Sequence, residues 1–88
     1  MIVQARLIKR RTEDGLVEMK DSVPIGKLYE ADLSRVYRGM PMRHENGTLH
    51  TKDVVWVKNP DGTWGWFALE LLQLKVPRGF TVTEKEGD

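Results

Sequence analysis

The 88-residue sequence contains no cysteine and no long apolar run, and it holds only two histidines. Without cysteine the chain forms no disulfide and no cysteine-rich metal site, which fits a reducing, cytoplasmic location. No apolar stretch approaches the roughly 20 residues that cross a bilayer, and the first residues do not resemble a basic leader followed by an apolar run. Neither a membrane segment nor a signal peptide is expected.

Recognisable catalytic motifs are missing as well. Ser22 and Ser34 are the only serines, and neither lies in a nucleophile elbow or beside a histidine in sequence. No glycine-rich phosphate loop occurs, and a chain of this size builds no deep pocket by itself. We therefore predict no catalytic residue, no metal site and no cofactor, and we expect a protein that is not an enzyme.

The two histidines are not expected to share a metal ion. Asn46-Gly47 is a strong signal for a two-residue hairpin loop. In that register the facing pairs are Glu45 with Thr48, His44 with Leu49, and Arg43 with His50. Successive side chains of a strand point to opposite faces, so the two imidazoles lie on opposite faces of the hairpin.

The composition is that of one globular domain. The apolar fraction is 40%, the charged fraction is 31% and the net charge is +1. A chain of this length can fold alone but is too short for two cores. The near-neutral charge argues against a dedicated nucleic-acid-binding protein, although basic stretches within residues 1–11 and 34–58 leave a local basic face open.

Alternating apolar residues predict an all-β fold. No segment sustains the apolar spacing of a long helix, whereas several short segments alternate with period two. The predicted strands cover residues 2–10, 27–33, 35–45, 48–52 and 73–76, with a hairpin and a short helical turn between 53 and 72. The predicted inward residues are Val3, Ala5, Leu7, Tyr29, Ala31 and Leu33. Residues 11–26 are expected to be irregular, 78–82 to form an extra edge strand and 84–88 to fray as an acidic tail. The domain would thus cover residues 1–77, and 78–88 would be a partly flexible extension.

The hairpin within residues 53–72 has a defined register. Asn59-Pro60-Asp61-Gly62 is typical of a three-residue loop closed by a bulge, with Gly62 at positive φ. Asn59 then faces Thr63, and Trp56 faces Trp66. One face carries Val55, Val57, Gly65 and Phe67, and the other carries Val54, Trp56, Lys58, Trp64 and Trp66. Lys58 marks the second face as the solvent side. The predicted interior comprises Leu7, Tyr29, Val55, Val57, Phe67 and Leu72.

Three tryptophans on the solvent side form a surface that needs a cover. At ~150 to 250 Å² each, they present roughly 500 Å² of aromatic area. The largest apolar patch on a typical monomer is about 300 to 600 Å². Residues 78–82 with Phe80, a second copy of the chain, or a ligand are three covers that the sequence leaves open. We expect the three indoles to be mostly removed from water.

Two segments carry a resemblance to a known family. Residues 65–72, GWFALELL, are similar to the GWFPSNYV segment of SH3 domains, and residues 26–31, GKLYEA, are similar to the strand after their long first loop. The resemblance implies a small five-stranded SH3-like barrel with a short 3₁₀ turn before the last strand. Where the family has a groove proline and tyrosine, this chain has Ala68 and Leu71, so binding of proline-rich peptides is not expected.

These observations favour a small, cytoplasmic, non-enzymatic binding or assembly module. Its partner would be a protein or a second copy of the chain, bound through the tryptophan face. The predicted binding residues are Tyr37, Arg38, Arg43, Trp56, Trp64 and Trp66. The first alternative is a nucleic-acid-binding accessory protein. Its phosphate contacts would be Arg35, Arg38, Arg43 and Lys58, and its bases would stack on Tyr37, Trp56 or Trp64. Further alternatives are an aromatic cage for a methylated cation, built from Tyr37, Trp56 and Trp64, and an enzyme whose site forms only in an oligomer.

Overall fold

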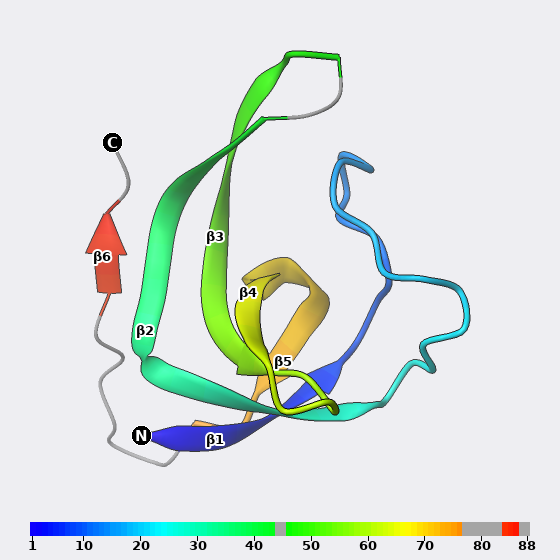
Figure 1. Ribbon diagram of the computed structural model, residues 1–88, viewed down its shortest axis with the longest axis vertical. Coiled ribbons are helices and arrows are strands. Elements are labelled where there is room, and N and C mark those ends of the chain that lie inside the picture. Colours follow the sequence, from blue (N-terminus) through cyan, green and yellow to red (C-terminus); the bar gives the residue numbers. More distant parts are fainter. Residues whose placement is uncertain (44–45, 77–83, 87–88) are drawn as a thin grey trace.

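The computed structural model describes residues 1–43, 46–76 and 84–86, the last three as backbone (Figure 1). The strands are β1 (Ile2–Leu7), β2 (Leu28–Arg43), β3 (Leu49–Lys58), β4 (Trp64–Ala68), β5 (Leu72–Leu74) and β6 (Glu84–Glu86). A 3₁₀ turn, η1 (Leu69–Leu71), separates β4 from β5. β1 to β5 form one antiparallel sheet in the order β4-β3-β2-β1-β5, and β6 pairs in parallel with β2. The all-β prediction and the 3₁₀ turn before β5 are confirmed.

The long strand β2 organises the sheet. Two separate strands were predicted over residues 27–33 and 35–45, but the chain forms one strand of 16 residues. Its first part, Leu28 to Asp32, pairs with β1, while β3 pairs with both parts. Figure 1 shows β2 turning sharply between these parts. Register shifts between Asp32 and Val36 and between Tyr37 and Met40 account for the bend, since extra residues on one strand kink it and increase its twist.

The core lies where the predicted alternation places it. Leu7, Ala31, Leu33, Val55 and Val57 are fully buried, and Tyr29 and Leu72 are nearly so. Phe67 is half-buried, packs against this core and lies with its ring centroid 5.2 Å from that of Tyr29. The predicted interior is therefore confirmed for Leu7, Tyr29, Val55, Val57 and Leu72, and in part for Phe67. Burial disfavours the charged phenolate of Tyr29 and raises its pKa.

The β3–β4 hairpin has the predicted register. Trp56 pairs with Trp66, and Val55 pairs with Phe67. Gly62 has a φ of +91°, and its backbone N–H donates to the Asn59 carbonyl at 2.9 Å. The Asn59 N–H donates to the Thr63 carbonyl at 2.7 Å, which closes the loop. Local turn chemistry therefore sets which side chains share the solvent face.

The β2–β3 hairpin differs by one residue from the prediction. Arg43 pairs with Leu49, and Met42, not Arg43, pairs with His50. The Asn46 side chain accepts the Thr48 N–H at 2.9 Å, and Gly47 has a φ of +83°. This side-chain turn at Asn46 accompanies the shift in register. His44 and Glu45 lie outside the described residues.

The ends of several elements also differ from the prediction. β1 stops at Leu7 instead of continuing to residue 10, and β5 starts at Leu72, one residue early. Residues 84–86 were expected to fray, but they form β6. β2 provides the physical reason, because its edge beyond the end of β1 presents backbone groups that a further strand can pair with. The predicted strand at 78–82 lies outside the described residues.

Candidate functional site

The strongest candidate site is the solvent face of β2, β3 and β4, called here the aromatic face: Arg35, Tyr37, Trp56, Trp64 and Trp66. The Trp56 and Trp66 rings meet edge to face, with centroids 4.8 Å apart. The Tyr37 ring lies 6.3 Å from that of Trp66, also edge to face. Such pairs hold one another in defined orientations. Three side chains from three strands therefore form one rigid aromatic cluster.

Arg35 completes this cluster. Its guanidinium lies 4.4 Å from the Trp56 ring centroid and 5.9 Å from that of Trp66. The bulge after Asp32 places it there, because Ser34 donates both its N–H (3.0 Å) and its hydroxyl (2.6 Å) to the Asp32 carboxylate. The Ser34 hydroxyl is the main reason that the pKa of Asp32 is lowered. Sequence reasoning treated Arg35 only as a phosphate contact, since a bulge inside β2 has no clear local signal.

The six predicted binding residues do not all come together. Tyr37, Trp56 and Trp66 are in the cluster, whereas Trp64 lies toward the loop end of the hairpin, opposite Lys58. Arg43 lies at the far end of β2, where it pairs with Leu49. The predicted cage of Tyr37, Trp56 and Trp64 is not seen as such, because the Arg35 guanidinium occupies the position over Trp56 that a bound cation would take.

Arg38 is engaged within the chain. Its guanidinium bonds the Asp53 carboxylate at 2.9 Å, and the same carboxylate accepts the Gly39 N–H at 2.9 Å. These contacts fill the second bulge of β2, where Gly39 has a φ of +69°. The Gly39 N–H, followed by Arg38, holds the pKa of Asp53 below its usual value. Arg38 therefore shapes the strand that carries Tyr37.

The three indoles are each half-buried in the single chain. Arg35 and Tyr37 are covering groups in the described part of the chain. The cover proposed for residues 78–82 lies outside the described residues. This burial agrees with the expectation that the tryptophans are mostly removed from water. Part of each indole is still accessible to a partner.

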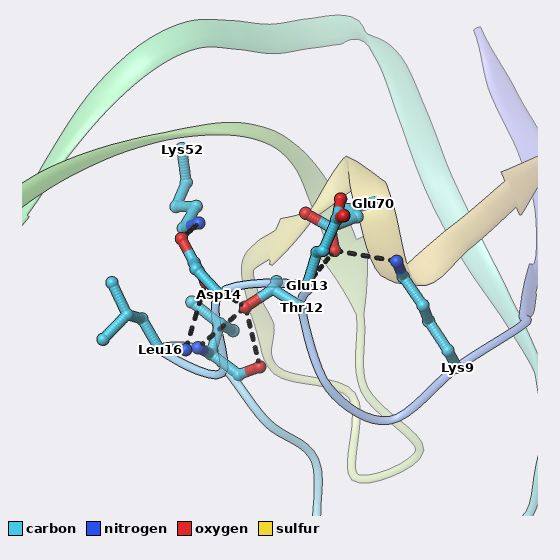
Figure 2. A network of polar contacts seen from close by, with 8 residues as sticks. Lys9, Thr12, Glu13, Asp14, Leu16, Lys52 and Glu70 are labelled. Carbon is cyan, nitrogen blue, oxygen red and sulfur yellow. Dashed lines mark hydrogen bonds and ion pairs between the residues drawn. The ribbon is translucent and has the colours of Figure 1, made fainter.

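A second cluster joins the long first loop to the sheet (Figure 2). Asp14 accepts the Thr12 hydroxyl at 2.7 Å and the Leu16 N–H at 3.1 Å, and it forms an ion pair with Lys52 of β3. Thr12 itself is only 2% exposed. The bond from Lys52, then that from Thr12, lowers the pKa of Asp14. The loop thus folds around one carboxylate that β3 holds in place.

Glu70 of η1 makes the other attachment. Its carboxylate forms a 2.8 Å ion pair with Lys9 and accepts the Glu13 N–H, as Figure 2 shows. The bond from Lys9 is the largest cause of its lowered pKa. Sequence reasoning missed both attachments, because Asp14 and Lys52 are 38 residues apart and Glu13 and Glu70 are 57 apart. The Asp14-Gly15 turn was the only local signal.

The hollow beside this cluster is polar and open. It measures about 540 Å³ and is lined by Arg38, Thr51, Lys52, Asp53, Ala68, Leu69 and Glu70. Its charged groups pair with one another or with the loop. Ala68 and Leu71, which stand at the groove positions of the SH3 resemblance, are 2% and 1% exposed and offer almost no surface.

Comparisons with family models, with curated proteins and with solved structures give no match for this chain. Within residues 1–43, 46–76 and 84–86, no group of three or more metal-ligating side chains converges. No helix in the same residues has the length and apolarity to cross a membrane. The aromatic face is therefore the strongest indication of function in this chain.

Proposed function

We propose that this chain is a small, non-enzymatic, SH3-like binding or assembly module that contacts a protein through its aromatic face. One observation carries the proposal: arginine, tyrosine and two tryptophans are fixed side by side on the face of the β3–β4 hairpin opposite Val55, Val57 and Phe67. Tryptophan, tyrosine and arginine are the residues that most often dominate the energy of protein interfaces.

Preorganisation strengthens the proposal. A surface that orders its side chains only on binding loses about 0.5 to 1.5 kcal/mol for each flexible side chain immobilised. Here the edge-to-face rings and the stacked guanidinium are already ordered in the free chain. The exposed charges around them, such as Lys58 paired with Glu30 at 3.8 Å, would form the polar rim of an interface.

The order of the strands supports the SH3-like part of the proposal. A strand after a long first loop, a meander through β2, β3 and β4, and a 3₁₀ turn before β5 follow the arrangement that the resemblance implies. The burial of Ala68 and Leu71 supports a partner other than a proline-rich helix. A proline-rich peptide would therefore bind no more tightly than an unrelated peptide.

Nucleic-acid binding is the alternative function. Its phosphate contacts would be Arg35, Arg38, Arg43 and Lys58. Arg35 is stacked on Trp56, Arg38 and Lys58 face carboxylates, and Arg43 lies at the far end of β2, away from the aromatic cluster. Titration of a single-stranded oligonucleotide against tryptophan emission separates the two functions. The proposal predicts no saturable quenching at moderate salt. Quenching that saturates and weakens steeply with salt would contradict it in favour of the alternative.

Sedimentation across dilution identifies the partner as a second copy or another protein. Association of the wild-type chain that Trp64→Ala weakens, and that Ile25→Ala leaves unchanged, would make the partner a second copy. Ile25 is a suitable control because it is 50% exposed and lies in the first loop, outside β2, β3 and β4. A monomeric chain at all concentrations would leave a different protein as the partner.

A further inference from the structure

The edge of β2 beyond β1 is occupied by β6. β1 pairs with β2 only from Leu28 to Asp32, and β6 takes the same edge at Val36, Tyr37 and Arg38. Figure 1 shows β6 beside the upper part of β2 and past the end of β1. Val36 and Tyr37 lie between the two bulges of β2, and Arg38 begins the second bulge. The bulges thus limit the regular edge to a short stretch.

β6 is an unusual occupant of this edge. It is three residues long, and it is parallel to β2 in a sheet whose other described strand pairs are antiparallel. Parallel pairs are slightly less stable for each residue than antiparallel pairs. β6 has the sequence Glu-Lys-Glu, without an apolar residue that could anchor it in the core. Backbone pairing and charge are therefore the forces available to hold it.

Charge complementarity indicates which sequences fit. Residues 84–88, EKEGD, carry three acids and one lysine, while the β2 segment from Ser34 to Arg38 carries two arginines and no acid. The register places Glu86 beside Arg38 and Glu84 beside Val36, next to Arg35. Asp53 offsets part of the Arg38 charge, and the Arg35 guanidinium, which lies over Trp56 on the adjoining face, adds a second positive group near this edge.

We propose that the β2 edge at Val36–Arg38 is a strand-addition site for acidic, extended protein segments, and that β6 occupies it as an internal competitor. Main-chain hydrogen bonds to an exposed sheet edge supply affinity in this mode of recognition, and flanking charges supply selectivity. A tethered strand competes at an effective concentration in the millimolar range, so an outside segment binds well only when β6 is displaced.

The test uses the full chain with β6 blocked. In a parallel pair, every second residue of a strand forms backbone hydrogen bonds to the neighbouring strand. One of the two neighbours Glu84 and Lys85 therefore donates its N–H to β2. Replacing both by proline removes that N–H, whichever of the two carries it. The probe is a synthetic peptide of residues 82–88, VTEKEGD. Its binding is followed through the backbone amide shifts of Val36 to Arg38. Glu84→Asp with Glu86→Asp is the control that keeps both charge and pairing.

The proposal predicts saturable shifts at Val36 to Arg38 in the proline variant and binding at least about tenfold weaker in the wild type and the aspartate control. A peptide with lysine at both glutamate positions should bind more weakly than VTEKEGD. Three results would each overturn the proposal: no shift at these amides in the proline variant, equal binding by wild type and variant, or equal binding of the lysine peptide.

A second measurement covers the case in which the proline variant does not fold. In the full chain, Glu84→Lys with Glu86→Lys places positive charge next to Arg35 and Arg38. Amide exchange at Val36 to Arg38 should then become faster than in the wild type, while core amides such as those of Leu7 and Ala31 keep their protection. Unchanged exchange at the β2 edge would contradict a charge-selective site.

Discussion

At the scale of single residues, Arg35 sets the chemistry of the aromatic face. The Asp32–Ser34 bulge turns its side chain over Trp56, where the guanidinium both covers the indole and adds positive charge. The face therefore presents a cation on an aromatic base instead of bare rings. This arrangement favours a partner with acidic or polar groups around an apolar centre.

Replacing Arg35 by alanine removes this contact. We expect a loss of about 0.5 to 1 kcal/mol in the free energy of unfolding, the usual value for an exposed cation–π contact, and a red shift of tryptophan emission as Trp56 gains water. The control is Arg6→Ala, at an exposed position of β1, which should change the free energy of unfolding by less than about 0.5 kcal/mol. Unshifted emission in the Arg35 variant would show that the guanidinium does not cover the indole in solution.

Leu7 and Ile2 test the inward and outward sides of β1. Leu7 is fully buried and Ile2 is 51% exposed on the same strand. Leu7→Ala should cost about 2 to 5 kcal/mol, because it leaves a cavity in a small core. Ile2→Ala should change the free energy of unfolding by less than about 1 kcal/mol. If urea denaturation shows the same loss in the free energy of unfolding for both variants, the assignment of Leu7 to the inward face is wrong.

At the scale of elements, the β3–β4 loop depends on one backbone conformation. Gly62 has a φ of +91°, and a Cβ there would meet no atom within 4 Å, so the effect of a substitution is conformational. Gly62→Ala should cost about 1 to 2 kcal/mol. Gly65→Ala is the matched control, since its nearest neighbour would be Asn59 Nδ2 at 3.8 Å and its φ is ordinary. A thermal midpoint lowered equally in both variants would rule out the bulged loop as the cause.

The attachments of the first loop should make the protein sensitive to acid. Both Asp14 and Glu70 have a pKa below the ordinary value because their partners favour the carboxylate. In the unfolded chain these carboxyl groups have an ordinary pKa of about 4. Their contribution to stability is therefore complete above that pH, and it is lost as the pH falls through their lower pKa values in the folded chain. Asp14→Asn with Glu70→Gln should lower stability at pH 7 and flatten this acid dependence in urea titrations.

Some acid dependence should remain in that double variant. Asp32, Asp53 and Asp61 also have lowered pKa values, and hydrogen bonds from Ser34, Gly39 and Thr63 are the main causes. If the free energy of unfolding depends on pH equally in the wild type and in the double variant, the loop attachments do not form in solution.

The elements that follow from local chemistry could be predicted from the sequence. The Asn59-Pro60-Asp61-Gly62 loop encodes its own register, and alternation in β1 and early β2 identifies the inward residues. Residues that meet across long sequence distances could not be predicted this way. The ion pair of Asp14 with Lys52, the bulge that directs Arg35 and the pairing of β6 with β2 each depend on the assembled sheet.

At the scale of the whole molecule, one long strand links two surfaces. The face of β2 supplies Arg35 and Tyr37 to the aromatic cluster, while its edge at Val36 to Arg38 pairs with β6. Side chains and backbone of the same few residues thus serve different contacts. Binding at the face and at the edge should be separable, because substitution of an aromatic side chain leaves the backbone edge in place.

Site-specific photocrosslinking tests the aromatic face most directly. A benzoylphenylalanine replaces Trp64 in one variant and, in another, Ile25, a control position in the first loop that is 50% exposed. After irradiation in cells that express the chain, mass spectrometry identifies the adducts. The account predicts a discrete protein adduct, a second copy or one other protein, at position 64 and none at position 25. Adducts to nucleic acid, or the same scattered adducts at both positions, would contradict it.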